Sequence, residues 1–217
     1  MKISVSFLKS KYDLETTIKK INETNADFLH VDVMDGKFVP NISCVYEEVS
    51  DTLKMSNKLL DVHLMVSDPE EYILKYKNLN PYMITIHYEI DKNIKELIDL
   101  IHSYGIKVGI SIKPNTSVME IEDILDDIDN VLVMSVEPGK GGQKFIESSK
   151  EKVDLLCSLK NDSDYLISVD GGINNDTVLK VNNADIVISG SYVCMSDNYQ
   201  ENINKIKGIY EEYSIKL

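Results

Sequence analysis

Residues 28–34 read Phe28-Leu29-His30-Val31-Asp32-Val33-Met34, a run in which apolar and polar side chains alternate with a period of two. Successive side chains of a β-strand point to opposite faces, so the aliphatic residues at 29, 31 and 33 share one face, and His30, Asp32 and Met34 share the other. The pattern is typical of a barrel strand, which has one face toward outer helices and the other inside the barrel.

Seven further β-rich runs recur along the chain, and helix-like amphipathic stretches separate them. Eight such repeats predict the α/β class and a (β/α)8 TIM barrel, as a single domain over residues 1–217, with an active site at the carboxyl ends of the strands. An open doubly wound sheet is the alternative, but it normally has a Gly-rich turn after the first strand, which this sequence lacks. The seven runs are Ile3–Phe7, Leu59–Val66, Tyr82–His87, Val108–Ile112, Val131–Val136, Leu166–Asp170 and Ile186–Ser189.

The composition excludes several classes of protein. The chain has 217 residues, 43% of them hydrophobic, and a formal net charge of −13 with no arginine. An acidic chain without arginine is not expected to bind nucleic acid. No apolar run is long enough to cross a bilayer or to form a signal peptide, so we expect no membrane association and a cytoplasmic location. Three widely spaced cysteines are interpreted as reduced core thiols, and self-association of the barrel stays open.

Polar side chains point inward from three of the predicted strands. Besides His30 and Asp32, the same alternation turns His63 and Asp170 inward, near the carboxyl ends of their strands. One inward histidine is more often a hydrogen-bonded core residue, but burying all four groups is costly unless they are paired or bind a metal. A set of two histidines and two aspartates suits one divalent ion, and Zn²⁺, Fe²⁺, Mn²⁺ and Co²⁺ all stay open.

Three methionines lie on the same inward face, namely Met34, Met65 and Met134. Core filling is the usual role of such side chains. Their functional interpretation is a wall that excludes water from a delocalised anion without donating a proton. His87 is also inward, and we expect it to support the metal ligands rather than to bind the ion itself.

Glycines follow the last three predicted strands, in Pro138-Gly139-Lys140-Gly141-Gly142-Gln143, in Asp170-Gly171-Gly172 and in Gly190-Ser191. Barrels commonly bind phosphate in the loops after the seventh and eighth strands, through backbone N–H groups and helix N-termini. These loops therefore give a chain without arginine a means of holding a phosphorylated ligand.

Four strings of this sequence closely resemble the ribulose-phosphate 3-epimerase family, and the resemblance runs from Ile3 to about Ser196. It implies a (β/α)8 barrel, interconversion of D-ribulose 5-phosphate and D-xylulose 5-phosphate in the pentose phosphate pathway, and one divalent metal ion. The strings are HVDVMDGKFVPN at 30–41, DVHLMV at 61–66, MSVEPG at 134–139 with GGQKF at 141–145, and VDGGI at 169–173.

The resemblance also implies roles for particular residues. Asp32 and Asp170 would exchange the C3 proton on the two sides of a cis-enediolate, and together with His30 and His63 they would bind the metal. Such a two-sided inversion requires two acid/base groups. Ser6 and His63 would touch the substrate. The sugar phosphate would be held by Gly141, Gly142, Gln143, Gly171, Gly172, Gly190 and Ser191.

Other functions compete with this one. A 3-epimerase of a longer ketose phosphate, such as allulose 6-phosphate, would use the same metal and acid/base set, and a non-catalytic barrel that binds a metal or a sugar phosphate comes from another class. The related decarboxylase and hexulose-phosphate synthase barrels have a lysine where this chain has Met34, which argues against them. Lys140 also departs from the resemblance, because an aromatic residue is common there.

Overall fold

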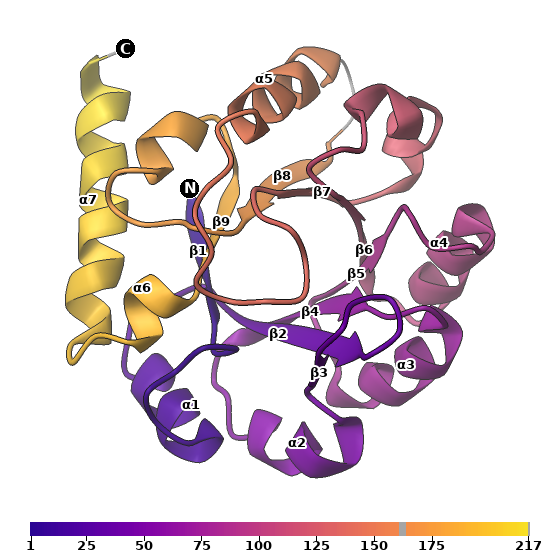
Figure 1. Ribbon diagram of the computed structural model, residues 1–217, viewed down its shortest axis with the longest axis horizontal. Coiled ribbons are helices and arrows are strands. Elements are labelled where there is room, and N and C mark those ends of the chain that lie inside the picture. The colour runs from indigo at the N-terminus through magenta and orange to yellow at the C-terminus, as the bar shows by residue number, and fades with distance from the viewer. Residues whose placement is uncertain (161–163, 217) are drawn as a thin grey trace.

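The computed structural model describes residues 1–160 and 164–216, and residues 161–163 and 217 of the predicted domain lie outside that description. Within it, eight parallel strands close into a barrel, in which β1 pairs with β9 on one side and with β2 on the other (Figure 1). The predicted TIM barrel is confirmed. The barrel strands are β1 (Lys2–Ser6), β2 (Phe28–Asp35), β4 (Leu59–Met65), β5 (Met83–His87), β6 (Lys107–Ile112), β7 (Asn130–Met134), β8 (Leu166–Asp170) and β9 (Ile186–Ser189).

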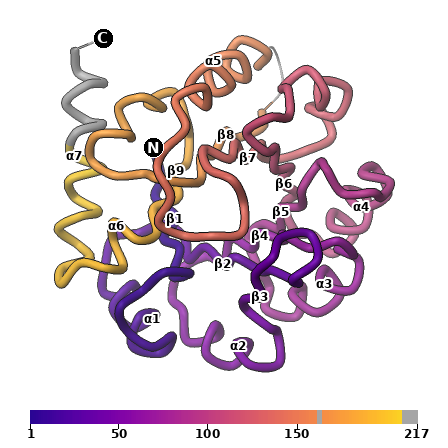
Figure 2. The backbone as a smooth tube through the Cα atoms, in the orientation of Figure 1, coloured from indigo at the N-terminus to yellow at the C-terminus, as the bar shows by residue number. Residues whose placement is uncertain are grey.

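Helices surround the barrel, and Figure 2 follows the chain from inner strands to outer helices and back. A short strand, β3 (Ile42–Ser43), pairs antiparallel with the end of β2. The α-helices are α1 (Leu14–Asn22), α2 (Tyr46–Leu53), α3 (Pro69–Tyr76), α4 (Ile94–Ser103), α5 (Ser149–Leu159), α6 (Ser191–Cys194) and α7 (Tyr199–Lys216). The 3₁₀ helices are η1 (Lys77–Leu79), η2 (Val118–Asp127) and η3 (Val178–Val181).

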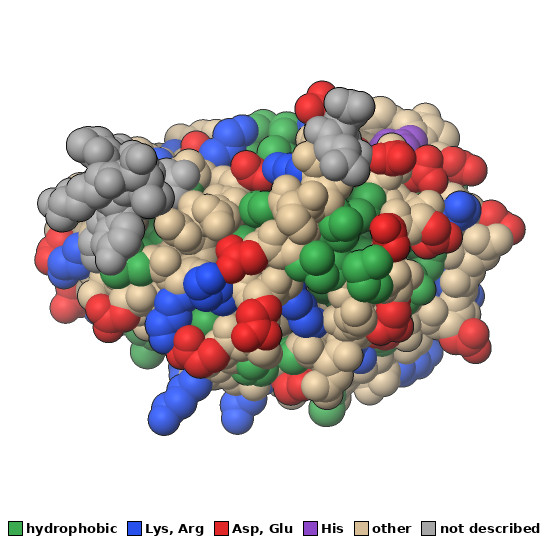
Figure 3. Space-filling view, turned by 90° about the horizontal axis from the view of Figure 1, so that it is seen from above, with side chains coloured by type: hydrophobic (Ala, Val, Ile, Leu, Met, Phe, Trp, Pro, Cys, Tyr) green, Lys and Arg blue, Asp and Glu red, His purple; other side chains and the backbone are tan. Residues whose placement is uncertain are grey.

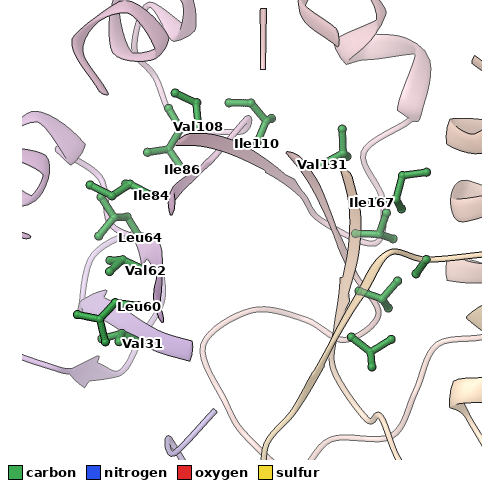
Figure 4. Close-up of a cluster of buried hydrophobic side chains, with 14 of the residues drawn as sticks. Val31, Leu60, Val62, Leu64, Ile84, Ile86, Val108, Ile110, Val131 and Ile167 are labelled. Carbon is green, nitrogen blue, oxygen red and sulfur yellow. The ribbon is translucent and has the colours of Figure 1, made fainter. Parts of the chain in front are cut away.

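The main core lies between the strands and the helices. Figure 4 shows aliphatic side chains that point outward from the barrel strands, among them Val31, Val62 and Ile110, and all three are fully buried. Removing this apolar surface from water stabilises the barrel. The outward face predicted for β2 is therefore part of the core, and so is the matching face of β4.

The strand register brings the inward polar residues together. Asp32 on β2 lies beside His63 on β4, and Met34 on β2 lies beside Met65 on β4, two residues further along each strand. Met134 on β7 lies beside Asp170 on β8. Because the barrel strands are parallel, their carboxyl ends share one end of the barrel, and this is where the inward residues gather.

The surface shows charges of both signs. On the face drawn in Figure 3, lysine side chains are interspersed with aspartate and glutamate side chains. Among residues 1–160 and 164–216, no helix is both long and apolar enough to cross a membrane.

Candidate metal and substrate site

Four side chains converge at the carboxyl ends of the barrel strands. His30 and Asp32 come from β2, His63 from β4 and Asp170 from the last residue of β8. Each offers a ligand atom, and these atoms all lie within 4.8 Å of one another. The Oδ1 atom of Asp32 is 3.3 Å from Nε2 of His30 and 3.4 Å from Nδ1 of His63, and Nδ1 of His63 is 4.0 Å from Oδ2 of Asp170.

This group fits a divalent metal ion. Ligand bonds of about 2.1 Å in a tetrahedral arrangement place ligand atoms about 3.4 Å apart, close to these separations. Nε2 of His30 and Nδ1 of His63 are buried and have no hydrogen-bond partner among the described residues. A buried nitrogen without a partner is costly, and coordination to an ion removes that cost.

The two aspartates have different electrostatic surroundings. Burial opposes the charge of Asp32, but the neighbouring His30 and His63 hold the pKa of its carboxyl well below the usual range. Burial and the negative charge of Asp32 raise the pKa of Asp170 to about 6. Carboxyl groups whose pKa values are driven apart in this way are suited to opposite roles in proton transfer.

Hydrogen bonds behind the cluster orient its members. Oδ2 of Asp61 accepts hydrogen bonds from Nδ1 of His30 at 2.7 Å and from the Ser4 hydroxyl at 2.9 Å. The Ser6 hydroxyl donates to Oδ2 of Asp32 at 2.6 Å. Asp61 precedes His63 by two residues and therefore shares its inward face, but the alternation alone does not reveal this role, which depends on the pairing of β2 with β4.

A cavity of about 540 Å³ opens above the cluster, and Asp32 and Asp170 lie in its wall. The predicted methionines are all in this wall and are nearly fully buried. The loop between β7 and α5 crosses the barrel opening in Figure 1 and contributes its glycines to the cavity. The cavity also contains the other predicted substrate-binding residues except the fully buried His63, namely Ser6, Gly141, Gly142, Gln143, Gly171, Gly172, Gly190 and Ser191.

Two glycines after β8 lie too close to the preceding loop for any side chain. A Cβ on Gly171 would lie 2.5 Å from a methyl group of Val136, and a Cβ on Gly172 would lie 2.6 Å from the backbone nitrogen of Phe145. The amide of Gln143 donates to the carbonyls of Glu137 and Lys140, at 2.6 and 2.8 Å, and so stabilises the same loop. Close backbone approach thus shapes this side of the cavity.

We expect Gly172→Ala to lower stability and raise the KM for a phosphorylated substrate more than Gly105→Ala does. Both glycines have positive φ, +65° and +71°, but a Cβ on Gly105 meets nothing within 4 Å. Backbone strain costs each variant about 1 kcal/mol, and only Gly172→Ala adds a clash with Phe145. Denaturant unfolding and steady-state kinetics measure both effects. Equal losses in the two variants would show that the close approach is unimportant.

Lys9 was not predicted, yet it lies in the cavity wall. A Cβ on Gly142 would lie 2.7 Å from its Nζ atom, so the ammonium group rests against the glycine loop. Lys140 and Lys144 are in the same wall. These lysines place positive charge at the cavity in a chain that has no arginine.

The fold and the clustered residues define a TIM barrel with a candidate metal centre at the carboxyl ends of its strands. Residues 2–194 match the model of the "Ribulose-phosphate 3 epimerase family". The ribulose-phosphate 3-epimerase of Bacillus subtilis is 36% identical over 214 residues, covering 96% of this chain and 99% of that protein. That of Helicobacter pylori is 38% identical over 215 residues, covering 96% and 98%. The chain belongs to the ribulose-phosphate 3-epimerase family.

Similar solved structures share the barrel at low identity. The structure of KGPDC from Streptococcus mutans has a TM-score of 0.70 at 12% identity, with 97% of both chains covered. The 3-hexulose-6-phosphate synthase of Salmonella typhimurium has a TM-score of 0.70 at 19% identity, with 98% of this chain and 100% of that chain covered. These likenesses support the fold.

Proposed function

We propose that this protein interconverts D-ribulose 5-phosphate and D-xylulose 5-phosphate by moving the proton at C3. The observation that carries the proposal is the pair of aspartates, Asp32 and Asp170, which line one cavity. The two histidines of the cluster lie buried behind them. A substrate carbon in this cavity is within reach of two carboxyl groups. Family membership supports the same reaction.

One carboxylate removes the C3 proton, and the other carboxyl group delivers a proton to the opposite side of the resulting cis-enediolate. Asp32 and Asp170 come from β2 and β8, which β1 and β9 separate, so they approach the cavity from different directions. Ser6 holds the second oxygen of Asp32 through its 2.6 Å hydrogen bond, and this leaves Oδ1 directed toward the cluster.

His30, Asp32, His63 and Asp170 would hold the ion, for which Zn²⁺, Fe²⁺, Mn²⁺ and Co²⁺ are the candidates. A bound divalent ion supplies a Lewis acid that lowers the cost of negative charge on the C2 oxygen. Met34, Met65 and Met134 line the cavity nearby and exclude water without offering a proton. The glycine loops and Ser191 would bind the phosphate through backbone N–H groups and the serine hydroxyl, in a field to which Lys9 adds positive charge.

A coupled assay for D-xylulose 5-phosphate tests the substrate, with D-allulose 6-phosphate as a competing substrate in parallel. The proposal predicts a kcat/KM for D-ribulose 5-phosphate well above that for the six-carbon ketose. The reverse order would assign the protein to the longer sugar phosphate. Metal binding without turnover of either ketose would point to a non-catalytic barrel.

Lys140→Phe is expected to change the KM for D-ribulose 5-phosphate more than kcat. Lys140 is exposed in the β7–α5 loop and lies in the cavity wall. Its substitution therefore changes the charge at the cavity mouth and the side chain that covers it, but it leaves Asp32 and Asp170 unchanged. Steady-state kinetics at two ionic strengths measures the change, because a contribution from charge weakens with salt. An unchanged KM would show that Lys140 does not contribute to substrate binding.

A further inference from the structure

A line of buried hydrogen bonds leads away from the metal site through His63. Its Nε2 atom is 3.0 Å from Nε2 of His87, and Nδ1 of His87 is 3.0 Å from Oε2 of Glu89. Oε1 of Glu89 accepts a 2.6 Å hydrogen bond from the backbone N–H of Lys113 and another from the hydroxyl of Thr116. Both histidines are fully buried.

The Glu89 carboxylate, at the end of this line, determines which ring nitrogens of the two histidines carry a hydrogen. Although burial opposes its charge, hydrogen bonds from His87, the Lys113 amide and Thr116 lower the pKa of Glu89 to about 2. The His87 ring is fully buried, and each of its nitrogens has one hydrogen-bond partner, Glu89 at Nδ1 and His63 at Nε2. A carboxylate only accepts hydrogen bonds, so Nδ1 of His87 carries the hydrogen and its Nε2 has a free lone pair.

We propose that Glu89 and His87 are positioning residues that hold the Nδ1 lone pair of His63 toward the metal. Because Nε2 of His87 accepts, Nε2 of His63 must donate, and this leaves Nδ1 as the nitrogen of His63 with the free lone pair. That atom lies 3.4 Å from Oδ1 of Asp32 and has no hydrogen-bond partner among the described residues. Metal-binding histidines commonly have their tautomer set through the other ring nitrogen, here by two residues in series.

Glu89→Gln is a sharp test because Oε1 already accepts two hydrogen bonds. The amide oxygen keeps these bonds to Lys113 and Thr116, so the NH₂ group replaces Oε2 and faces His87. His87 must then accept at Nδ1 and donate from Nε2, which forces the hydrogen of His63 onto Nδ1, the atom that faces the metal. We expect a 10- to 100-fold loss of metal affinity, roughly the usual effect of changing such a partner.

The tautomers are measured by ¹H–¹⁵N NMR of the ring nitrogens in the metal-free full chain, whose four histidines keep the spectrum simple. The proposal predicts hydrogen on Nε2 of His63 in the unsubstituted protein and on Nδ1 in Glu89→Gln. Hydrogen on Nδ1 of His63 in the unsubstituted protein overturns it, and that result needs no variant to fold. An unchanged tautomer in a folded Glu89→Gln protein overturns it as well.

Zinc affinity, measured by competition with a chelator, is the second readout. Asp129→Asn is the matched control, because Oδ2 of Asp129 lies 3.0 Å from Nε2 of His102 just before β7, at the other end of the barrel. The control should leave zinc affinity unchanged, and equal losses in both variants would contradict the proposal. The inference rests on the proposed metal site. The tautomer of His63 is measured in the metal-free protein and without turnover, so the positioning role of Glu89 and His87 can fail while the epimerase activity stands, and the reverse.

Discussion

Asp170→Asn should lower kcat for the epimerisation about 100- to 10,000-fold, the range usual for loss of one acid/base group. Asparagine keeps the size of the side chain and one oxygen, but it cannot exchange a proton at C3. Asp32→Asn should produce a loss of the same order, because each direction of the reaction requires both groups. Coupled assays in both directions, with the metal content of each variant determined, measure these losses.

Deuterium exchange separates the two roles. The variant that keeps the base for D-ribulose 5-phosphate still exchanges the C3 proton of this substrate with solvent, but it forms no product. The other variant exchanges the C3 proton of D-xylulose 5-phosphate, again without forming product. Asp176→Asn is the control, since it removes the same charge from an exposed position in the loop after β8. Activity near that of the unsubstituted protein in either Asp32→Asn or Asp170→Asn would contradict the two-base mechanism.

Withdrawal of the metal should reduce kcat/KM by about 100-fold or more, because Lewis-acid stabilisation of an oxyanion contributes several kcal/mol. The buried nitrogens of His30 and His63 that face the cluster are the physical reason to expect an ion there. Dialysis against a chelator, followed by addition of Zn²⁺, Mn²⁺, Co²⁺ or Fe²⁺ under reducing conditions, measures the loss and its recovery. Full activity in protein shown by elemental analysis to be metal-free would contradict the role of the ion.

The barrel could be predicted because the local signals agree with the tertiary structure. The run predicted at 28–34 becomes β2 (Phe28–Asp35), and the other seven predicted runs match barrel strands to within two residues at either end. Ser117 forms a capping box with Glu120, a local signal for a helix start, and the segment that follows is the 3₁₀ helix η2. The strand β3 has no comparable signal, since it consists of two residues, one of them exposed.

The candidate metal residues could be predicted because a strand alternates with a period of two residues. This period distinguishes inward from outward positions without any knowledge of contacts. Their partners could not. Glu89 lies in the loop after β5, outside any periodic pattern, and its hydrogen bonds with Lys113 and Thr116 form only when that loop meets the one after β6. The place of Lys9 against Gly142 depends in the same way on two loops that are distant in the sequence.

Metal-dependent epimerisation at C3 is tested by incubating the protein with D-ribulose 5-phosphate in D₂O and following the C3 proton by NMR. We expect this signal to disappear while D-xylulose 5-phosphate forms. We also expect a chelator to suppress both changes and added metal to restore them. Fully metal-loaded protein that neither exchanges the C3 proton nor forms the second ketose would contradict metal-dependent epimerisation.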